Sequence, residues 1–173
     1  MQPALEDTMF LLTLATVSTA LTAPTAVTAL FGPPWISIEL PANPYDRATK
    51  GAFLVVHAFH HGTPMGFPVS GKAEGLVNGQ RKSVELKFDR GERDGTYVLK
   101  NSWGNEGEWT LVISVTQGEN DAATAVVQVS GAKVIAVDVP TEQRGDWTVP
   151  KKVTLAEIEA TLKDRSTRLA ARP

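Results

Sequence analysis

The feature that most constrains this chain is a series of short strand-like runs between residues 35 and 139, each bounded by turn residues. Such runs recur at spacings of roughly 10 to 15 residues, a pattern typical of an all-β sandwich. The pattern predicts an antiparallel sandwich of about seven or eight strands. The expected strands are 36–40, 51–61, 73–77, 80–88, 95–101, 107–118, 123–129 and 132–139.

Four of these runs carry the clearest signals. Apolar and polar residues alternate in 36–40, as expected for a half-buried strand. The run 51–61 is apolar at both alternating sets of positions, so we expect a central strand covered on both faces. Asn78-Gly79 separates two runs and predicts a type I′ hairpin, because that turn needs two residues at positive φ.

Residues 1–31 differ from the rest of the chain, since no charged residue occurs between Asp7 and Glu39. The run 9–31 is long enough to span a bilayer, which takes about 20 apolar residues. It also resembles a secretory signal with small residues near a cleavage site, although no Lys or Arg precedes it. A cleaved signal and a retained anchor both remain open, and both predict that the following domain, 32–149, is exported and periplasmic. A cytoplasmic protein with an apolar N-terminal helix is a further alternative.

Residues 150–173 predict an amphipathic helix from about Thr154 to Ala171. Thr154 and Glu157 have the spacing of a capping box, in which each side chain bonds to the other residue's backbone N–H. Apolar residues then recur at helical spacing. This narrow stripe is a candidate for packing on the sandwich, on a partner or on a membrane surface; it comprises Leu155, Ile158, Leu162 and Leu169.

Composition and motifs argue against several classes of function. The chain has no cysteine, which excludes thiolate chemistry, and its formal net charge of −2 gives no overall attraction to nucleic acid, whose binding usually needs a basic surface. A Gly-x-Ser-x-Gly nucleophile elbow and a phosphate-binding Gly-rich loop are both missing. We therefore predict a protein that is not an enzyme and needs no cofactor.

A resemblance to a known family arises in residues 94–115. Asp94, Gly95 and Tyr97 resemble the strand entry of immunoglobulin-like domains, in which a corner tyrosine bonds to nearby backbone. A Gly-x-Trp strand follows at Gly107 to Trp109. The pair is similar to exported bacterial domains of the YtkA-like and CopC-like kind. The resemblance implies an immunoglobulin-like sandwich over about residues 35–130, and some of those relatives bind copper.

The three histidines and Met65 are therefore candidates for a copper or other metal site. In a continuous strand, His57 and His61 share one face and lie roughly 13 Å apart, too far to hold one ion. Only His60, His61 and Met65 could converge, through the turn at residues 62–64. The alternative is that His57 is a half-buried strand residue and that the other two histidines end the strand.

Three tryptophans, Trp35, Trp103 and Trp147, lie at strand edges or in loops, whereas Trp109 is expected in the core. Tryptophan is enriched in binding hot spots and at membrane interfaces, although each ring could also cap one end of the core. We predict a membrane-extrinsic accessory or scaffolding subunit that binds and stabilises a larger membrane protein complex, of a respiratory or photosynthetic type. The alternatives are a periplasmic metal-binding domain and a soluble ligand-binding module.

Overall fold

The computed structural model describes residues 32–40 and 43–170, and in this part of the chain the secondary structure is mostly β. Twelve strands form three antiparallel sheets, with one 3-10 turn, η1 (Arg47–Thr49), and one helix, α1 (Leu155–Ala170). The expected N-terminal apolar segment, 1–31, lies outside the described residues. Among the described residues, no helix has the length and hydropathy needed to traverse a bilayer.

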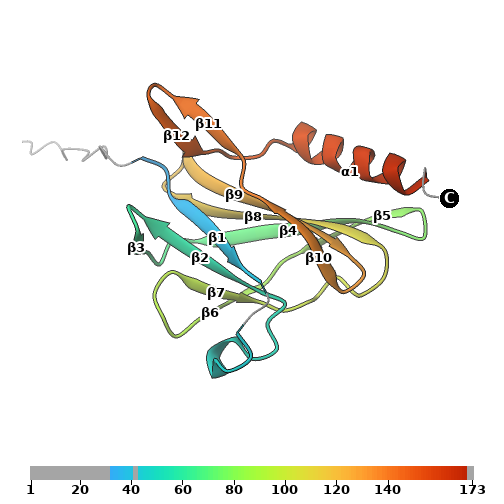
Figure 1. Cartoon of the computed structure of the whole chain (residues 1–173), viewed down its shortest axis with the longest axis horizontal. Helices are drawn as coiled ribbons and strands as arrows, with labels where there is room; N and C mark the ends of the chain where they lie inside the picture. The colour runs from blue at the N-terminus through green and yellow to red at the C-terminus, as the bar shows by residue number, and fades with distance from the viewer. Residues whose placement is uncertain (1–31, 41–42, 171–173) are drawn as a thin grey trace, which may run out of the picture. The chain divides into compact units, whose positions relative to one another are not determined.

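The first sheet has the strand order β1-β2-β7-β6, with the short β3 paired to β2 (Figure 1). Its strands are β1 (Trp35–Glu39), β2 (Leu54–His60), β3 (Thr63–Pro64), β6 (Phe88–Arg90) and β7 (Thr96–Leu99). Since β2 pairs with both β1 and β7, the prediction that the 51–61 run forms a central strand is confirmed.

The second sheet has the order β10-β9-β8-β4-β5. Its strands are β4 (Val69–Val77), β5 (Gln80–Glu85), β8 (Glu108–Gln117), β9 (Asp121–Ser130) and β10 (Lys133–Asp138). Each of the eight expected runs overlaps one of the observed strands, which confirms the prediction of an antiparallel all-β sandwich. The run 80–88 is divided, however, because the chain leaves the second sheet after Glu85 and enters the first sheet at Phe88.

The core lies between these two sheets, and alternate residues of each strand supply it. In β8, the inward-facing Trp109, Leu111 and Ile113 are almost completely buried. Trp109 packs on Gly75 of β4, where an added Cβ would lie 2.3 Å from the indole ring. The backbone of β4 is therefore the wall of the pocket that holds this ring, and its indole N–H donates to the Glu106 carbonyl at 2.8 Å.

Two-residue turns set the register of two hairpins. Asn78 and Gly79 have φ values of 52° and 76° between β4 and β5, which confirms the predicted turn. His61 and Gly62, with φ of 48° and 78°, form a second such turn between β2 and β3. His61 therefore belongs to a turn and not to a continuous strand, so the facing of His57 and His61 expected from strand alternation does not apply.

The C-terminal third adds a third sheet, the hairpin of β11 (Thr141–Arg144) and β12 (Trp147–Pro150). The helix α1 follows and extends away from this hairpin (Figure 1). Its predicted capping box is confirmed: the Thr154 N–H donates to Glu157 Oε2 at 2.8 Å, and the Glu157 N–H donates to Thr154 Oγ1 at 3.3 Å.

Candidate binding surfaces

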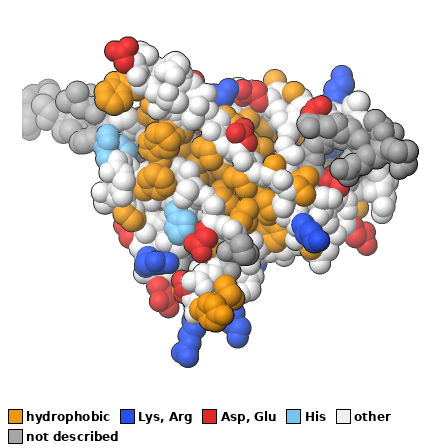
Figure 2. Space-filling model, viewed as in Figure 1, with side chains coloured by type: hydrophobic (Ala, Val, Ile, Leu, Met, Phe, Trp, Pro, Cys, Tyr) orange, Lys and Arg blue, Asp and Glu red, His pale blue; other side chains and the backbone are white. Residues whose placement is uncertain are grey.

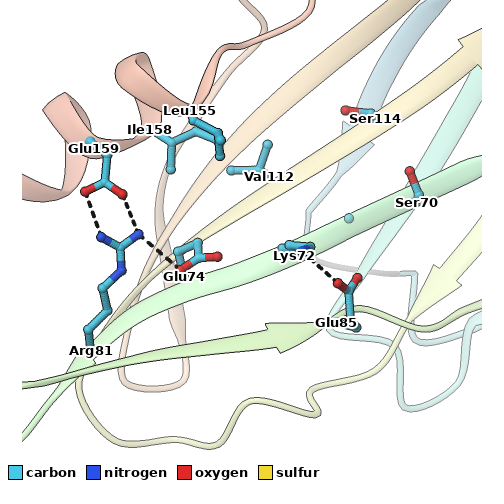
Figure 3. A pocket seen from close by; sticks show the side chains of 11 residues that line it. Ser70, Lys72, Glu74, Arg81, Glu85, Val112, Ser114, Leu155, Ile158 and Glu159 are labelled. Carbon is cyan, nitrogen blue, oxygen red and sulfur yellow. Dashed lines mark hydrogen bonds and ion pairs between the residues drawn. The ribbon is translucent and has the colours of Figure 1, made fainter.

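A groove separates α1 from the outer face of the second sheet (Figure 3). It has a volume of about 210 Å³ and is walled by Leu155 and Ile158 of the helix and by Val112 of β8. The floor comes from the outward-facing residues of β4 and β8, including Ser70 and Ser114. The apolar side chains above and below face each other, so this groove suits an apolar or amphipathic occupant.

Charged side chains line the rim of this groove in two groups. Arg81 of β5 binds the Glu159 carboxylate with both terminal nitrogens, at 2.7 and 2.6 Å, and reaches Glu74 at 3.4 Å. These contacts lower the pKa of Glu159 and raise that of Arg81. Lys72 pairs with Glu85 at 2.9 Å, which raises the pKa of the lysine. Arg81 thereby joins the helix to the sheet by a two-pronged ion pair.

The four apolar residues predicted as the stripe of α1 differ in burial. Ile158 is buried against the sheet, with only 8% of its surface exposed, whereas Leu155 is 79% exposed. Leu162 is partly buried, and the side chain of Leu169 lies outside the described part of the structure. The stripe therefore serves mainly to dock α1 on its own domain at Ile158, while Leu155 remains accessible to a partner.

The three candidate tryptophans also differ in exposure. Trp103 is instead buried, at 7% exposure, where its ring meets Phe53 edge to face with centroids 5.0 Å apart. Trp35, at the start of β1, is partly buried. Trp147, beside the turn of the β11–β12 hairpin, is 76% exposed. Trp147 is thus the candidate best placed to contact another molecule.

The histidines at the end of β2 are brought together by the turn at residues 61–62. The rings of His60 and His61 meet edge to face, with centroids 4.2 Å apart. His60 Nε2 also lies 2.9 Å from the Gly32 carbonyl oxygen, so this ring holds the entry to β1. Met65 lies in the loop that follows and is 37% exposed.

His57 is separate from this pair, because it faces Glu39 of the neighbouring strand at 2.9 Å between Nε2 and Oε2. Among the residues that the structure describes, no group of three or more His, Cys, Asp and Glu side chains is arranged to hold a metal ion. What the turn assembles is a pair of imidazoles, and two ligands alone do not complete a tetrahedral site.

Exposed apolar side chains concentrate late in the chain. Of the seven large hydrophobic residues that are exposed in the described part, four lie between residues 135 and 155; these are Ile135, Val137, Trp147 and Leu155. Figure 2 shows hydrophobic side chains across the middle of the viewed face, over the region between β1 and β10. Both of these strands are edges of their sheets, so this open side of the sandwich is a second apolar surface.

Sequence reasoning did not anticipate the β11–β12 hairpin or the groove. The hairpin had a signal, because Gly145-Asp146 is a dipeptide typical of tight hairpins and Gly145 has a φ of 63°. The groove had none, since it combines residues of β4, β5 and β8 with a helix that follows much later in the sequence. Tyr97, expected to bond to backbone nearby in the sequence, donates its hydroxyl to the Phe67 carbonyl, 30 residues upstream.

Comparison of the chain with family models, with curated proteins and with solved structures found no match.

Proposed function

We propose that this protein is a non-enzymatic accessory subunit, exported to the periplasm, which binds and stabilises a larger membrane protein complex. The observation that carries the proposal is the placement of Trp147. A tryptophan that is 76% exposed, on a hairpin outside the two core sheets, contributes nothing to the core of its own domain. Exposed tryptophan side chains of this kind are typical anchors of protein interfaces and of the headgroup region of membranes.

The arrangement of strands supports the finer assignment of an immunoglobulin-like domain, a fold that often serves as a binding module. The order β1-β2-β7-β6 corresponds to the A, B, E and D strands of such domains. The order β9-β8-β4 corresponds to their G, F and C strands. The division of the 80–88 run between the two sheets fits the same scheme, in which the chain changes sheet before strand D.

Co-purification tests the proposal. The full chain is extracted from its native membranes in mild detergent, and the molecular mass of the particle that contains it is measured. We expect a stable large complex, and we expect Trp147→Ala to release the protein from it. Tyr45→Ala is the matched control, because Tyr45 is 92% exposed but belongs to the segment before β2. A wild-type protein that elutes as a free monomer would contradict the proposal.

The contact between His60 and His61 favours a second candidate, periplasmic metal binding. Neighbouring imidazoles are suitable ligands for copper or zinc if the remaining positions are filled by Met65, water or a partner. Metal analysis of the purified protein tests this candidate, with His61→Ala as the variant and His57→Ala as the control. The absence of metal at a stoichiometric level after incubation with copper or zinc would exclude it.

A further inference from the structure

The first described residues of the chain are firmly held on the sandwich. Gly32 is the first described residue, and its carbonyl oxygen lies 2.9 Å from His60 Nε2. Pro33 and Pro34 follow and are both buried, and β1 begins at Trp35. The described chain is therefore held on its own domain from its first residue, Gly32.

Several loops gather at this same end of the sandwich, which we call the junction end. It comprises Gly32, the loop 60–68, the turn 117–121 and the hairpin 141–150. Neighbouring members are linked by contacts: the Thr116 N–H donates to the Pro68 carbonyl at 3.1 Å, and Arg144 Nη1 lies 3.7 Å from Asp121 Oδ1. The start of β1, β3 and the β11–β12 hairpin lie on the left in Figure 1, whereas α1 lies on the right.

Apolar side chains are exposed among the turns of the junction end. Trp147 is 76% exposed and Met65 is 37% exposed, and the tip formed by residues 61–64 is exposed throughout. The exposed charged side chains of the junction end are Glu119, Glu142, Arg144 and Asp146, which sum to −2. This composition suits the zwitterionic interface of a bilayer, in which tryptophan is enriched because it combines an apolar ring with one hydrogen-bond donor.

We infer that the junction end rests on the lipid headgroup layer, with Trp147 and the 61–65 loop inserted at the interface. This inference depends on the proposed function, specifically on attachment of the protein to a membrane. Residues 9–31 form an apolar run of 23 residues, long enough to span the hydrocarbon core, and it stops one residue before Gly32. The length of this run, and its end directly before Gly32, favour a lipid surface over a protein as the occupant of this end.

Quenching of tryptophan fluorescence by brominated lipid tests the inference. The full-length protein is reconstituted into phosphatidylcholine vesicles with and without bromine on the acyl chains near the headgroups. The four tryptophans differ in burial, since Trp109 and Trp103 are in the core, Trp35 is partly buried and Trp147 is exposed. We expect quenching in brominated vesicles, and we expect Trp147→Phe to remove most of it. Trp103→Phe is the control and should leave the quenching unchanged.

A second probe does not depend on tryptophan. Because the chain contains no cysteine, a single introduced cysteine carries a unique label. We expect the emission of an environment-sensitive fluorophore at Thr63→Cys to shift to shorter wavelength on reconstitution. The emission of the same label at Lys82→Cys, which lies on β5 just after the turn Asn78-Gly79, should not shift. The contact is apolar, so anionic lipid should not increase either signal.

The outcomes separate this inference from the proposed function. Protein that floats with the vesicles but shows no Trp147-dependent quenching and no shift at position 63 would overturn the inference alone. Protein that does not associate with vesicles or with native membranes would remove the membrane attachment on which both depend. Protein that joins a complex only through Trp147, with no quenching in lipid, would assign this end to a protein partner and would overturn the lipid contact.

Discussion

Replacement of Ile158 by alanine should release helix α1 from the sandwich without unfolding the sandwich itself. An isolated helix of 16 residues is marginally stable in water, so α1 depends on its packing. Ile158 is its most buried described side chain, at 8% exposure. Truncation of a buried isoleucine to alanine typically costs about 2–5 kcal/mol. Because this site borders an open groove, we expect a value near the lower limit.

A loss of about 2 kcal/mol corresponds to roughly a 30-fold shift in the equilibrium between the docked and the released helix. The ion pairs of α1 do not compensate for this loss, since Arg81 and Glu159 are about half exposed and exposed pairs contribute little. The released form of the helix should therefore be about 30-fold more populated in Ile158→Ala, so its amide hydrogens should exchange correspondingly faster, while the amides of β8 stay protected.

Hydrogen exchange measured by mass spectrometry on residues 155–164 and 109–115 provides the assay. Leu155→Ala is the matched control, because it removes a leucine from the same helix at a position that is 79% exposed. It should leave exchange in both segments close to that of the wild type. Equal protection of α1 in Ile158→Ala and in the wild type would refute the reasoning that this one contact docks the helix.

Three further predictions concern the core, the junction end and the helix cap. Gly75→Ala should destabilise the fold by about 1–3 kcal/mol in denaturant unfolding, because its Cβ would lie within 2.8 Å of three Trp109 ring carbons. Tyr97→Phe should cost about 1 kcal/mol and speed amide exchange in the 62–68 loop, because it removes the hydrogen bond to Phe67. The start of α1 should loosen as the pH falls from 4.5 toward 2. Lys151 and the Thr154 donors lower the pKa of Glu157 to about 2, so its stabilising contacts are complete above the ordinary value of 4.5 and are lost on protonation.

Each of these predictions has a control within the chain. Gly32→Ala should be neutral, since nothing lies within 4 Å of its added Cβ, and equal destabilisation at both glycines would contradict the steric argument. Tyr45→Phe should leave loop exchange unchanged, because Tyr45 is 92% exposed. Glu157→Gln should abolish the acid-dependent loosening of α1 when backbone amide shifts are followed by NMR. A pH dependence that persists in this variant would assign the effect to another carboxyl group.

The strands and the helix could be predicted because their signals are local. Asn78-Gly79 specifies a hairpin through the φ values that only such residues adopt readily, and Thr154 with Glu157 specifies a helix start within one turn of chain. The sites could not be predicted in the same way. Whether Trp103 or Trp147 is exposed depends on what packs over each ring, and both residues lie near a glycine in a polar stretch of the sequence.

The sequence by itself determined the class of fold, because hydrophobic alternation and turn chemistry act over a few residues and leave few ways to bury the apolar faces. Only the tertiary structure decided which residues are available for binding. It buried Trp103 and Ile158, exposed Trp147 and Leu155, and brought His60, His61 and Gly32 together at one end. The physical reason is that exposure and proximity depend on the packing of segments far apart in the chain, which no local pattern records.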